Sequence, residues 1–118
     1  MRNAGFVKSR EKAVSCENRT FRIYKGDRSG DDVVVTVDGE VLNPRRDLRA
    51  HSLDFDCGRP GCGAMQLALA ILADHLGDDD FALCVYKHFA FAVVANLPYK
   101  EWTLNSQEIE TALKAMSA

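Results

Sequence analysis

Residues 64–76 constrain the fold most, because apolar side chains would lie on nearly every side of the helix that they form. A helix that is hydrophobic all round is stable in water only at the centre of a protein. The rest of the chain must therefore cover this helix. Gly77 is a typical helix stop and Asp78 a typical cap, so we predict a second helix from there to about Asn96, ahead of Pro98.

Strands are predicted upstream of the central helix. Residues 20–24 alternate between apolar and polar side chains, residues 32–37 are rich in valine, and residues 40–42 form a return strand. The Asp-Gly pair at 38–39 is typical of a tight type I′ hairpin turn. Residues 25–31 are interpreted as a turn-rich connection. Together these segments predict a three-stranded antiparallel meander, which needs helices on one face to be stable.

A third helix is predicted near the C-terminus. Asn105 and Glu108 have the spacing of a reciprocal helix cap, and apolar residues follow at helical intervals to Met116. The predicted fold is α+β: a three-stranded antiparallel β-meander followed by three helices packed on one face. One domain is expected over residues 19–118, and residues 1–18 are expected to be a flexible tail. The predicted core consists of Phe21, Ile23, Val33, Val35, Val37, Leu67, Ile71, Leu72, Phe81, Val85, Phe89, Val93, Trp102, Ile109 and Leu113.

The composition is that of an ordinary globular protein. Its 118 residues include 47% hydrophobic and 27% charged side chains, and no apolar run approaches the roughly 20 residues of a membrane span. The basic residues near the start are not followed by an apolar block, so no secretory signal is predicted. We therefore expect a cytoplasmic protein with reduced cysteines, and we expect Cys84 to be buried.

Charge is distributed unevenly along the chain. Residues 1–50 carry 11 Lys or Arg against 8 Asp or Glu, whereas residues 51–118 carry 4 against 9. Such a bipolar surface can steer a charged partner, and it can equally favour self-association into a homodimer.

The segment at residues 43–63 has no convincing periodicity. Long irregular segments inside compact domains are often binding loops, so this loop is the predicted working surface. Gln66 stands just beyond it on the otherwise apolar helix. We interpret Gln66 as a core amide that the loop backbone satisfies, and the functional alternative is a contact to a ligand.

Metal and thiol chemistry are alternatives at the same loop. A zinc site is one alternative, because cysteine and histidine are the residue types that bind zinc. Its candidate ligands are Cys57, Cys62 and His51, with His75 or Cys84 as a possible further ligand. An enzyme site is the other alternative. In it Cys57 or Cys62 would be the nucleophile, His51 the base, and Asp54 the residue that orients the base. The chain lacks a second closely spaced cysteine pair and any known nucleophile motif. We therefore expect no metal, no cofactor and no catalytic residues.

Two further alternatives involve anions. Gly58, Gly61 and Gly63 precede the first helix, whose N-terminus could bind a phosphate or nucleotide with help from Arg59, Arg46 or Arg49. The structural alternative is that these glycines allow close packing under the helix. A nucleic-acid interface is the other possibility, with Tyr24 stacking on a base beside a basic set. That set comprises Arg22, Lys25, Arg28, Arg45, Arg46 and Arg49.

Several segments resemble an uncharacterised prokaryotic family of small proteins with a domain of unknown function. The similarity covers about residues 20–116 and is carried by residues 24–27, 35–39, 48–52, 63–74, 75–78, 93–98 and 102–104. The resemblance implies a stand-alone protein, often carried on mobile elements such as gene cassettes. It centres on the Leu-Arg-Ala-His-Ser run at 48–52, the glycines and Gln66. The family pattern lacks cysteines at positions 57 and 62, which counts against zinc or thiol chemistry.

The leading hypothesis is a non-enzymatic accessory protein that binds another protein through the 43–63 loop. Binding of a small anion or nucleotide, and binding of RNA or DNA, are the alternatives. The candidate binding residues are Arg46, Arg49, His51, Ser52, Arg59, Gly61, Gly63 and Gln66, and the zinc alternative uses His51, Cys57 and Cys62.

Overall fold

A computed structural model describes residues 21–117 of the protein, so the tail predicted for residues 1–18 lies outside the described part. In this part the strands form one antiparallel sheet in the order β3-β2-β1-β4. The strands are β1 (Ile23–Ser29), β2 (Asp32–Val37), β3 (Glu40–Val41) and β4 (Glu101–Asn105). The α+β class is confirmed, with four strands where the sequence predicted three.

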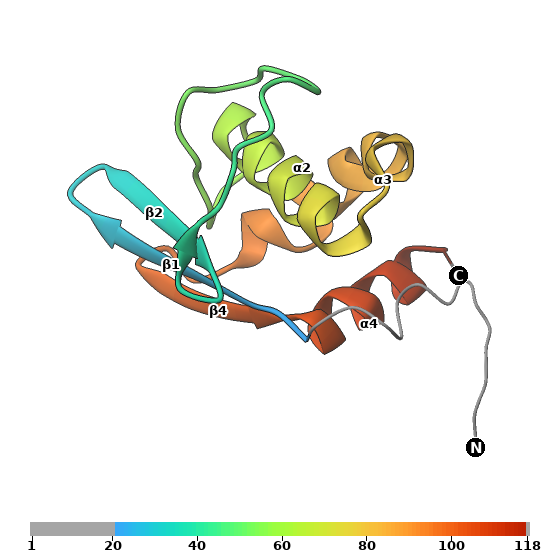
Figure 1. The fold of residues 1–118 in the computed structure, drawn as a ribbon. Helices are drawn as coiled ribbons and strands as arrows, with labels where there is room; N and C mark the ends of the chain where they lie inside the picture. Colours follow the sequence, from blue (N-terminus) through green and yellow to red (C-terminus); the bar gives the residue numbers. More distant parts are fainter. Residues whose placement is uncertain (1–20, 118) are drawn as a thin grey trace.

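Three α-helices and one short 3₁₀ turn complete the described residues. They are α2 (Cys62–Leu76), α3 (Asp79–Ala92), the 3₁₀ turn η2 (Val94–Asn96) and α4 (Ser106–Ser117). Figure 1 shows α2 and α3 above the sheet, with α4 continuing beyond the end of β4. The helix predicted to reach Asn96 thus ends at Ala92, and its remainder is η2. Within residues 21–117 no helix is long and apolar enough to cross a membrane.

The central position predicted for the first helix is confirmed in α2. Every side chain from Gln66 to Ala73 is buried, and the apolar ones join a single hydrophobic cluster with the inner face of the sheet. The sheet contributes Tyr24, Val33, Val35 and Leu104 to this cluster. The Cys62 start of α2 lies two residues before the predicted one.

The predicted turn and cap chemistry is confirmed. Asp38 and Gly39 both have positive φ angles, 52° and 88°, as a type I′ hairpin requires. Gly77 ends α2 in the left-handed conformation, and the Asp78 carboxylate accepts a hydrogen bond from the Phe81 amide. At α4, Asn105 and Glu108 each accept a hydrogen bond from the other's backbone amide.

The first strand was predicted wrongly. Residues 25–31 were interpreted as a connection, but β1 runs through Gly26 and Asp27 to Ser29. Gly26 belongs in the strand because Trp102 of β4 lies directly opposite. A Cβ atom at Gly26 would lie 2.2 Å from Cε2 of the Trp102 ring, so this glycine makes room for an indole rather than for a turn.

Strand β4 was missed because its partner is β1, at the far end of the described chain. Trp102 was interpreted as a core lid, and it is indeed buried, together with Leu104. Its neighbours Glu101 and Thr103 are exposed. This alternation is that of a strand with one face on the core.

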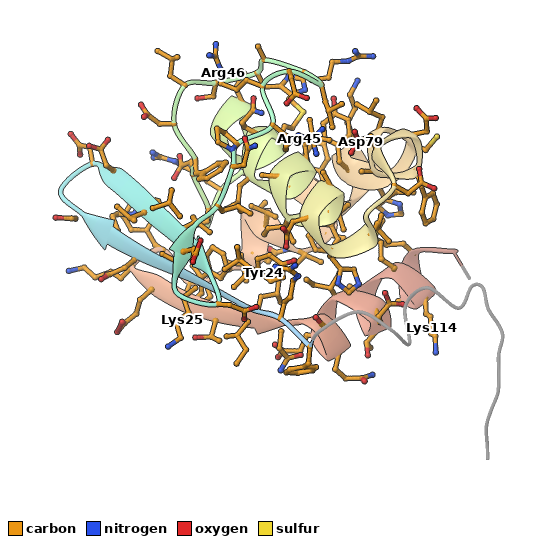
Figure 2. The ribbon with its side chains drawn as sticks, viewed as in Figure 1. Tyr24, Lys25, Arg45, Arg46, Asp79 and Lys114 are labelled. Atoms are coloured by element: carbon orange, nitrogen blue, oxygen red, sulfur yellow. The ribbon has the colours of Figure 1, made fainter. Side chains whose placement is uncertain are left out.

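Four residues predicted to be buried are exposed: Phe21, Ile23, Phe81 and Cys84. Tyr24 and Gly26 face the core, so strand alternation turns Phe21 and Ile23 to the opposite side. Figure 2 shows Tyr24 inside and Lys25 outside the sheet. Phe81 and Cys84 lie on the outer side of α3. The predicted core residues Val85, Val93 and Leu113 are half-buried at the margin of the hydrophobic core.

We expect Gly26→Ala to lower the free energy of unfolding by about 2 kcal/mol, because the added methyl group must displace a buried indole. Urea unfolding followed by tryptophan fluorescence measures this. Ser29→Ala, on an exposed position of the same strand, is the control and should change stability by less than about 0.5 kcal/mol. Equal stabilities of the two variants would show that Trp102 does not depend on the glycine.

Candidate functional site

The segment between β3 and α2 is an irregular loop that arches over α2 (Figure 1). We call residues 43–61 the 43–61 loop, because α2 begins at Cys62. Apart from an isolated β-bridge between Phe55 and Val33, it forms no strand or helix. Its shape must therefore come from side-chain contacts at both of its ends.

Gln66 holds the first half of the loop through four hydrogen bonds. Its amide nitrogen donates to the carbonyl oxygens of Pro44 and Arg49, at 2.7 and 3.0 Å. Its amide oxygen accepts from the backbone amides of His51 and Ser52, at 2.7 and 3.2 Å. A primary amide offers two donors and two acceptor lone pairs, so the whole capacity of this fully buried side chain is used. The interpretation of Gln66 as a core amide is confirmed.

Two further contacts tie the same half of the loop to α3. Nε2 of His51 lies 2.7 Å from the hydroxyl oxygen of Tyr86. Arg45 bridges Asp47 in the loop and Asp79 at the start of α3, with N–O distances of 2.9 to 3.1 Å (Figure 2). These hydrogen bonds lower the pKa of Asp47 and raise that of Arg45. The loop is thereby fixed to both central helices.

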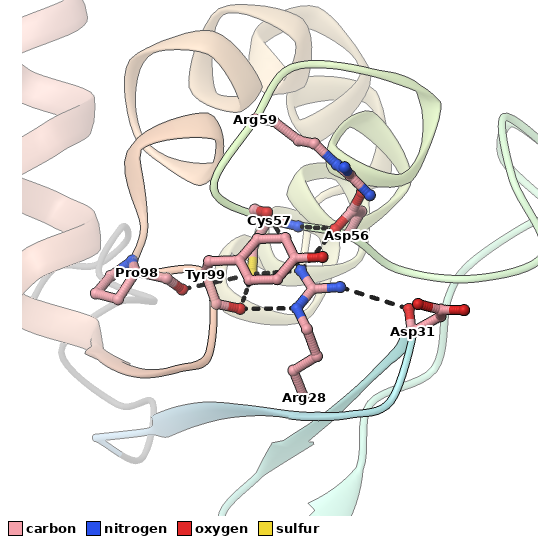
Figure 3. A network of polar contacts seen from close by, with 7 residues as sticks. All are labelled: Arg28, Asp31, Asp56, Cys57, Arg59, Pro98 and Tyr99. Carbon is pink, nitrogen blue, oxygen red and sulfur yellow. Dashed lines mark hydrogen bonds and ion pairs between the residues drawn. The ribbon is translucent and has the colours of Figure 1, made fainter.

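A cluster around Arg28 holds the second half of the loop (Figure 3). The Arg28 side chain is only 4% exposed and lies over the Tyr99 ring, with 3.5 Å between the guanidinium carbon and the ring centroid. It donates to the Asp56 carboxylate at 2.8 Å and to the Tyr99 carbonyl at 2.9 Å. Arg59 donates to the other Asp56 oxygen at 2.8 Å. The cluster thus connects β1, the loop and the segment before β4.

The Asp56 carboxyl keeps its charge in this cluster. Burial raises its pKa, but the hydrogen bonds from Arg28 and Arg59 lower it by more, so the net pKa lies below the ordinary 3.8. Its neighbour Cys57 is fully buried, and the thiol points to the carbonyl oxygens of Pro98 and Tyr99.

The predicted site residues fall into two groups. Arg46, Arg49 and Arg59 are exposed on the outside of the loop, as is Leu53, which the sequence did not single out. His51, Ser52 and Gln66 instead face inward and hold the loop. Gly61 is the N-cap of α2, and Gly63 packs under the loop, since a Cβ there would lie 2.6 Å from Cβ of Asp56.

The residues of the zinc and thiol hypotheses are directed to different places. His51 is engaged with Tyr86, the Cys57 thiol faces the carbonyl oxygens of residues 98 and 99, and Cys62 is exposed. Over residues 21–117 no three His, Cys, Asp or Glu side chains gather as metal ligands would. Asp54 is exposed, and its backbone amide donates to the hydroxyl of Ser52, while the His51 ring is directed to Tyr86. The geometry therefore provides no support for either chemistry.

Several cations of the two anion-binding hypotheses are already paired or buried. Arg59, the cation nearest the start of α2, is already bonded to Asp56. Among the basic set, Arg28 is buried and Arg45 is paired with two aspartates. Tyr24 is fully buried and donates its hydroxyl to Asp74, so it offers no ring for stacking on a base.

Sequence reasoning missed Arg28, Asp56 and Tyr99 as one cluster. They come from three segments that are far apart in the chain, and each alone looks like an ordinary surface residue. One sequence feature could have indicated the cluster. Charged and aromatic residues lie next to turn-forming Gly and Pro at 56–61 and 98–99, which is typical of a packed loop rather than a loose one.

Fold and site together define a class: a small α+β protein whose core helix holds an irregular, arginine-bearing surface loop in one shape. Residues 24–115 match the family of unknown function DUF6166, and the chain belongs to that family. The match spans all but one residue of the described sheet, the loop and most of the helical part. No curated protein and no solved structure matches the chain. The resemblance to a family of unknown function is confirmed, and its prokaryotic origin remains a prediction.

We expect Gln66→Leu to lower the free energy of unfolding by about 3 kcal/mol, because it leaves buried carbonyl and amide groups of the loop without partners. Urea unfolding gives the stability, and hydrogen exchange should become faster at the amides of His51 and Ser52. Gln107→Leu, at an exposed position of α4, is the matched control. Unchanged exchange at both amides would contradict the role of Gln66.

Asp56 should make stability depend on pH in the acid range. Its folded-state pKa lies below that of the unfolded chain, so its stabilising effect is present above 3.8 and is lost as the pH falls through the folded-state pKa. Between neutral and strongly acidic pH, we expect the unfolding midpoint of Asp56→Asn to decrease less than that of the unaltered protein. Asp54→Asn, an exposed neighbour, should follow the unaltered protein. Parallel curves for Asp56→Asn and the unaltered protein would refute the assignment.

Proposed function

We propose that this protein is a non-enzymatic protein-interaction module and that the 43–61 loop is its binding surface. The observation that carries this proposal is the buried amide of Gln66, which fixes an irregular loop while its outer side chains stay exposed. A loop fixed in advance loses little conformational entropy on binding, so its contacts are converted more fully into affinity.

The outer side of the loop has the composition of a binding surface. Leu53 is 77% exposed, and the flexible arginines Arg46 and Arg49 are exposed on the same loop. Arginine is enriched at protein interfaces, and the exposed Leu53 adds apolar area that a partner could bury. A partner that offers carboxylates around one apolar side chain would complement this surface.

The two alternatives have less support. An anion at the start of α2 would have to compete with Asp56 for Arg59, and a nucleic acid would find Arg28 and Arg45 already engaged. An accessory role on a mobile element, and a cytoplasmic location, belong to the same proposal and rest on the sequence alone.

The proposal is tested by affinity capture from a lysate of the cells that produce the protein, before and after nuclease treatment. Arg46→Ala/Leu53→Ala should reduce retention of a bound protein at least tenfold, about 1.4 kcal/mol in binding free energy, because both contacts lie on the loop. The matched control is Lys25→Ala/Val34→Ala, which removes one cation and one exposed apolar side chain from the outer face of the sheet.

The proposal is supported if a bound protein is retained after nuclease treatment and by the control variant, but is lost from the loop variant. Retention that disappears with nuclease would make the protein a nucleic-acid binder. Equal retention by the two variants would place the binding surface elsewhere.

A further inference from the structure

The outer side of α3 carries large side chains that the described chain does not cover. Phe81, Cys84, His88 and Phe91 are all exposed and follow one another at intervals of three, four and three residues. This spacing places them in one row along the helix, as in the seam of a helix pair. Phe81 is 48% exposed and Phe91 65%, whereas the opposite side of α3 packs into the core through Ala82, Tyr86, Phe89 and Ala90.

Two hollows adjoin this row. The larger one, of about 430 Å³, lies between α3 and α4, and its lining includes Phe81, Cys84 and His88 of the row together with Glu110 and Lys114 of α4. Towards the C-terminus of α3, a smaller hollow of about 140 Å³ is lined by Pro60, Gly61, Ala64, Met65, Ala90 and Phe91. Each hollow thus has one of the two exposed phenylalanines in its wall.

The row is self-complementary. Read in either direction it begins and ends with phenylalanine and has smaller side chains between, and its midpoint is residue 86. A twofold axis through this point would run α3 antiparallel to the same helix of another molecule, so that residue i meets j and j meets i. Phe81 would then lie opposite the partner's Phe91, and Cys84 would lie opposite the partner's His88.

Charge favours the same arrangement. Asp78, Asp79 and Asp80 lie at the N-terminal end of α3, and among them only Asp79 is paired with Arg45. At the opposite end, beside Pro60, two arginines, Arg28 and Arg59, share the single carboxylate of Asp56, so that end keeps a net positive charge. An antiparallel pair brings the acidic end of each molecule to the basic end of the other, and a parallel pair would bring like charges together.

We propose that the α3 face is the interface of a homodimer, with two copies of α3 antiparallel about a twofold axis near residue 86. A standard interface buries about 800 Å² on each partner. Helix α3 alone is about 21 Å long and too narrow for this. The walls of the two hollows, from α4 and from the end of the 43–61 loop, widen the face at both ends. The interface takes in only the end of the 43–61 loop, at Pro60 and Gly61, and leaves out Arg46 and Leu53, on which the proposed partner binding is tested.

Sedimentation equilibrium of the full chain tests the proposal over a concentration series up to the millimolar range. We expect the unaltered protein to have twice the 13.1 kDa mass of the chain. Phe91→Glu should restore the monomer mass, because it buries an unpaired charge against the partner's Phe81. Val41→Glu, at a more exposed position on β3, is the matched control and should remain dimeric. Circular dichroism verifies that each variant is folded.

Crosslinking tests the register. In a chain carrying Cys16→Ser and Cys62→Ser, the thiol introduced by His88→Cys should form disulfides with the partner's Cys84 on oxidation by copper phenanthroline. A non-reducing gel then shows a covalent dimer. Phe91→Cys in the same background should give none, because its opposite residue is Phe81.

A monomeric unaltered protein, or a dimer that persists in Phe91→Glu, would overturn the interface. A covalent dimer from Phe91→Cys, or none from His88→Cys, would overturn the antiparallel register.

Discussion

A single buried amide, that of Gln66, is the contact on which the shape of the 43–61 loop depends. Carbonyl and amide groups of an irregular loop cannot pair with one another as they do in a strand, and they are costly to bury alone. Gln66 satisfies them by offering two donors and two acceptors from within the central apolar helix α2. The loop can therefore pack closely on the core without adopting a helix or strand, and its outer residues remain available for contacts.

The second half of the loop depends on charge rather than on a neutral amide. Arg28 emerges from the sheet, stacks on Tyr99 and shares Asp56 with Arg59. Such a pair is tolerated because both charges are hydrogen-bonded: the Arg28 side chain is almost fully buried, and Asp56 accepts from both arginines. One arginine thereby fixes three separate segments to one another. The two halves of the loop are thus held independently, one through the helices and one through the sheet.

Local sequence predicted what local interactions determine. The apolar helix, the hairpin turn at 38–39 and the caps at Asp78 and Asn105 depend on residues near in sequence, and each is confirmed. The role of Gln66 is also confirmed, although its partners lie 14 to 22 residues away, because a polar side chain on an apolar helix needs buried hydrogen-bond partners. The predictions that were wrong depend on distant partners. Gly26 resembles a turn residue until Trp102 is placed against it, and the outward position of Ile23 follows from the register of β1 with β4. The exposure of Phe81 similarly depends on which side of α3 the rest of the fold covers. For the site, the loop could be located from the sequence, but the Arg28 cluster could not, because its members meet only in the folded chain.

The position of β4 in the sheet has a consequence for how the protein is made. β4 pairs with β1, and the contact between Arg22 and Ser106 that closes this end of the sheet joins positions 84 residues apart. Closing so long a segment is entropically costly and slow compared with forming a hairpin. The β1–β2 hairpin and the α2–α3 pair can form while the chain is still being synthesised. The sheet is completed only after residues 101–105 have left the ribosome, so the inner face of β1 stays uncovered until Trp102 is available.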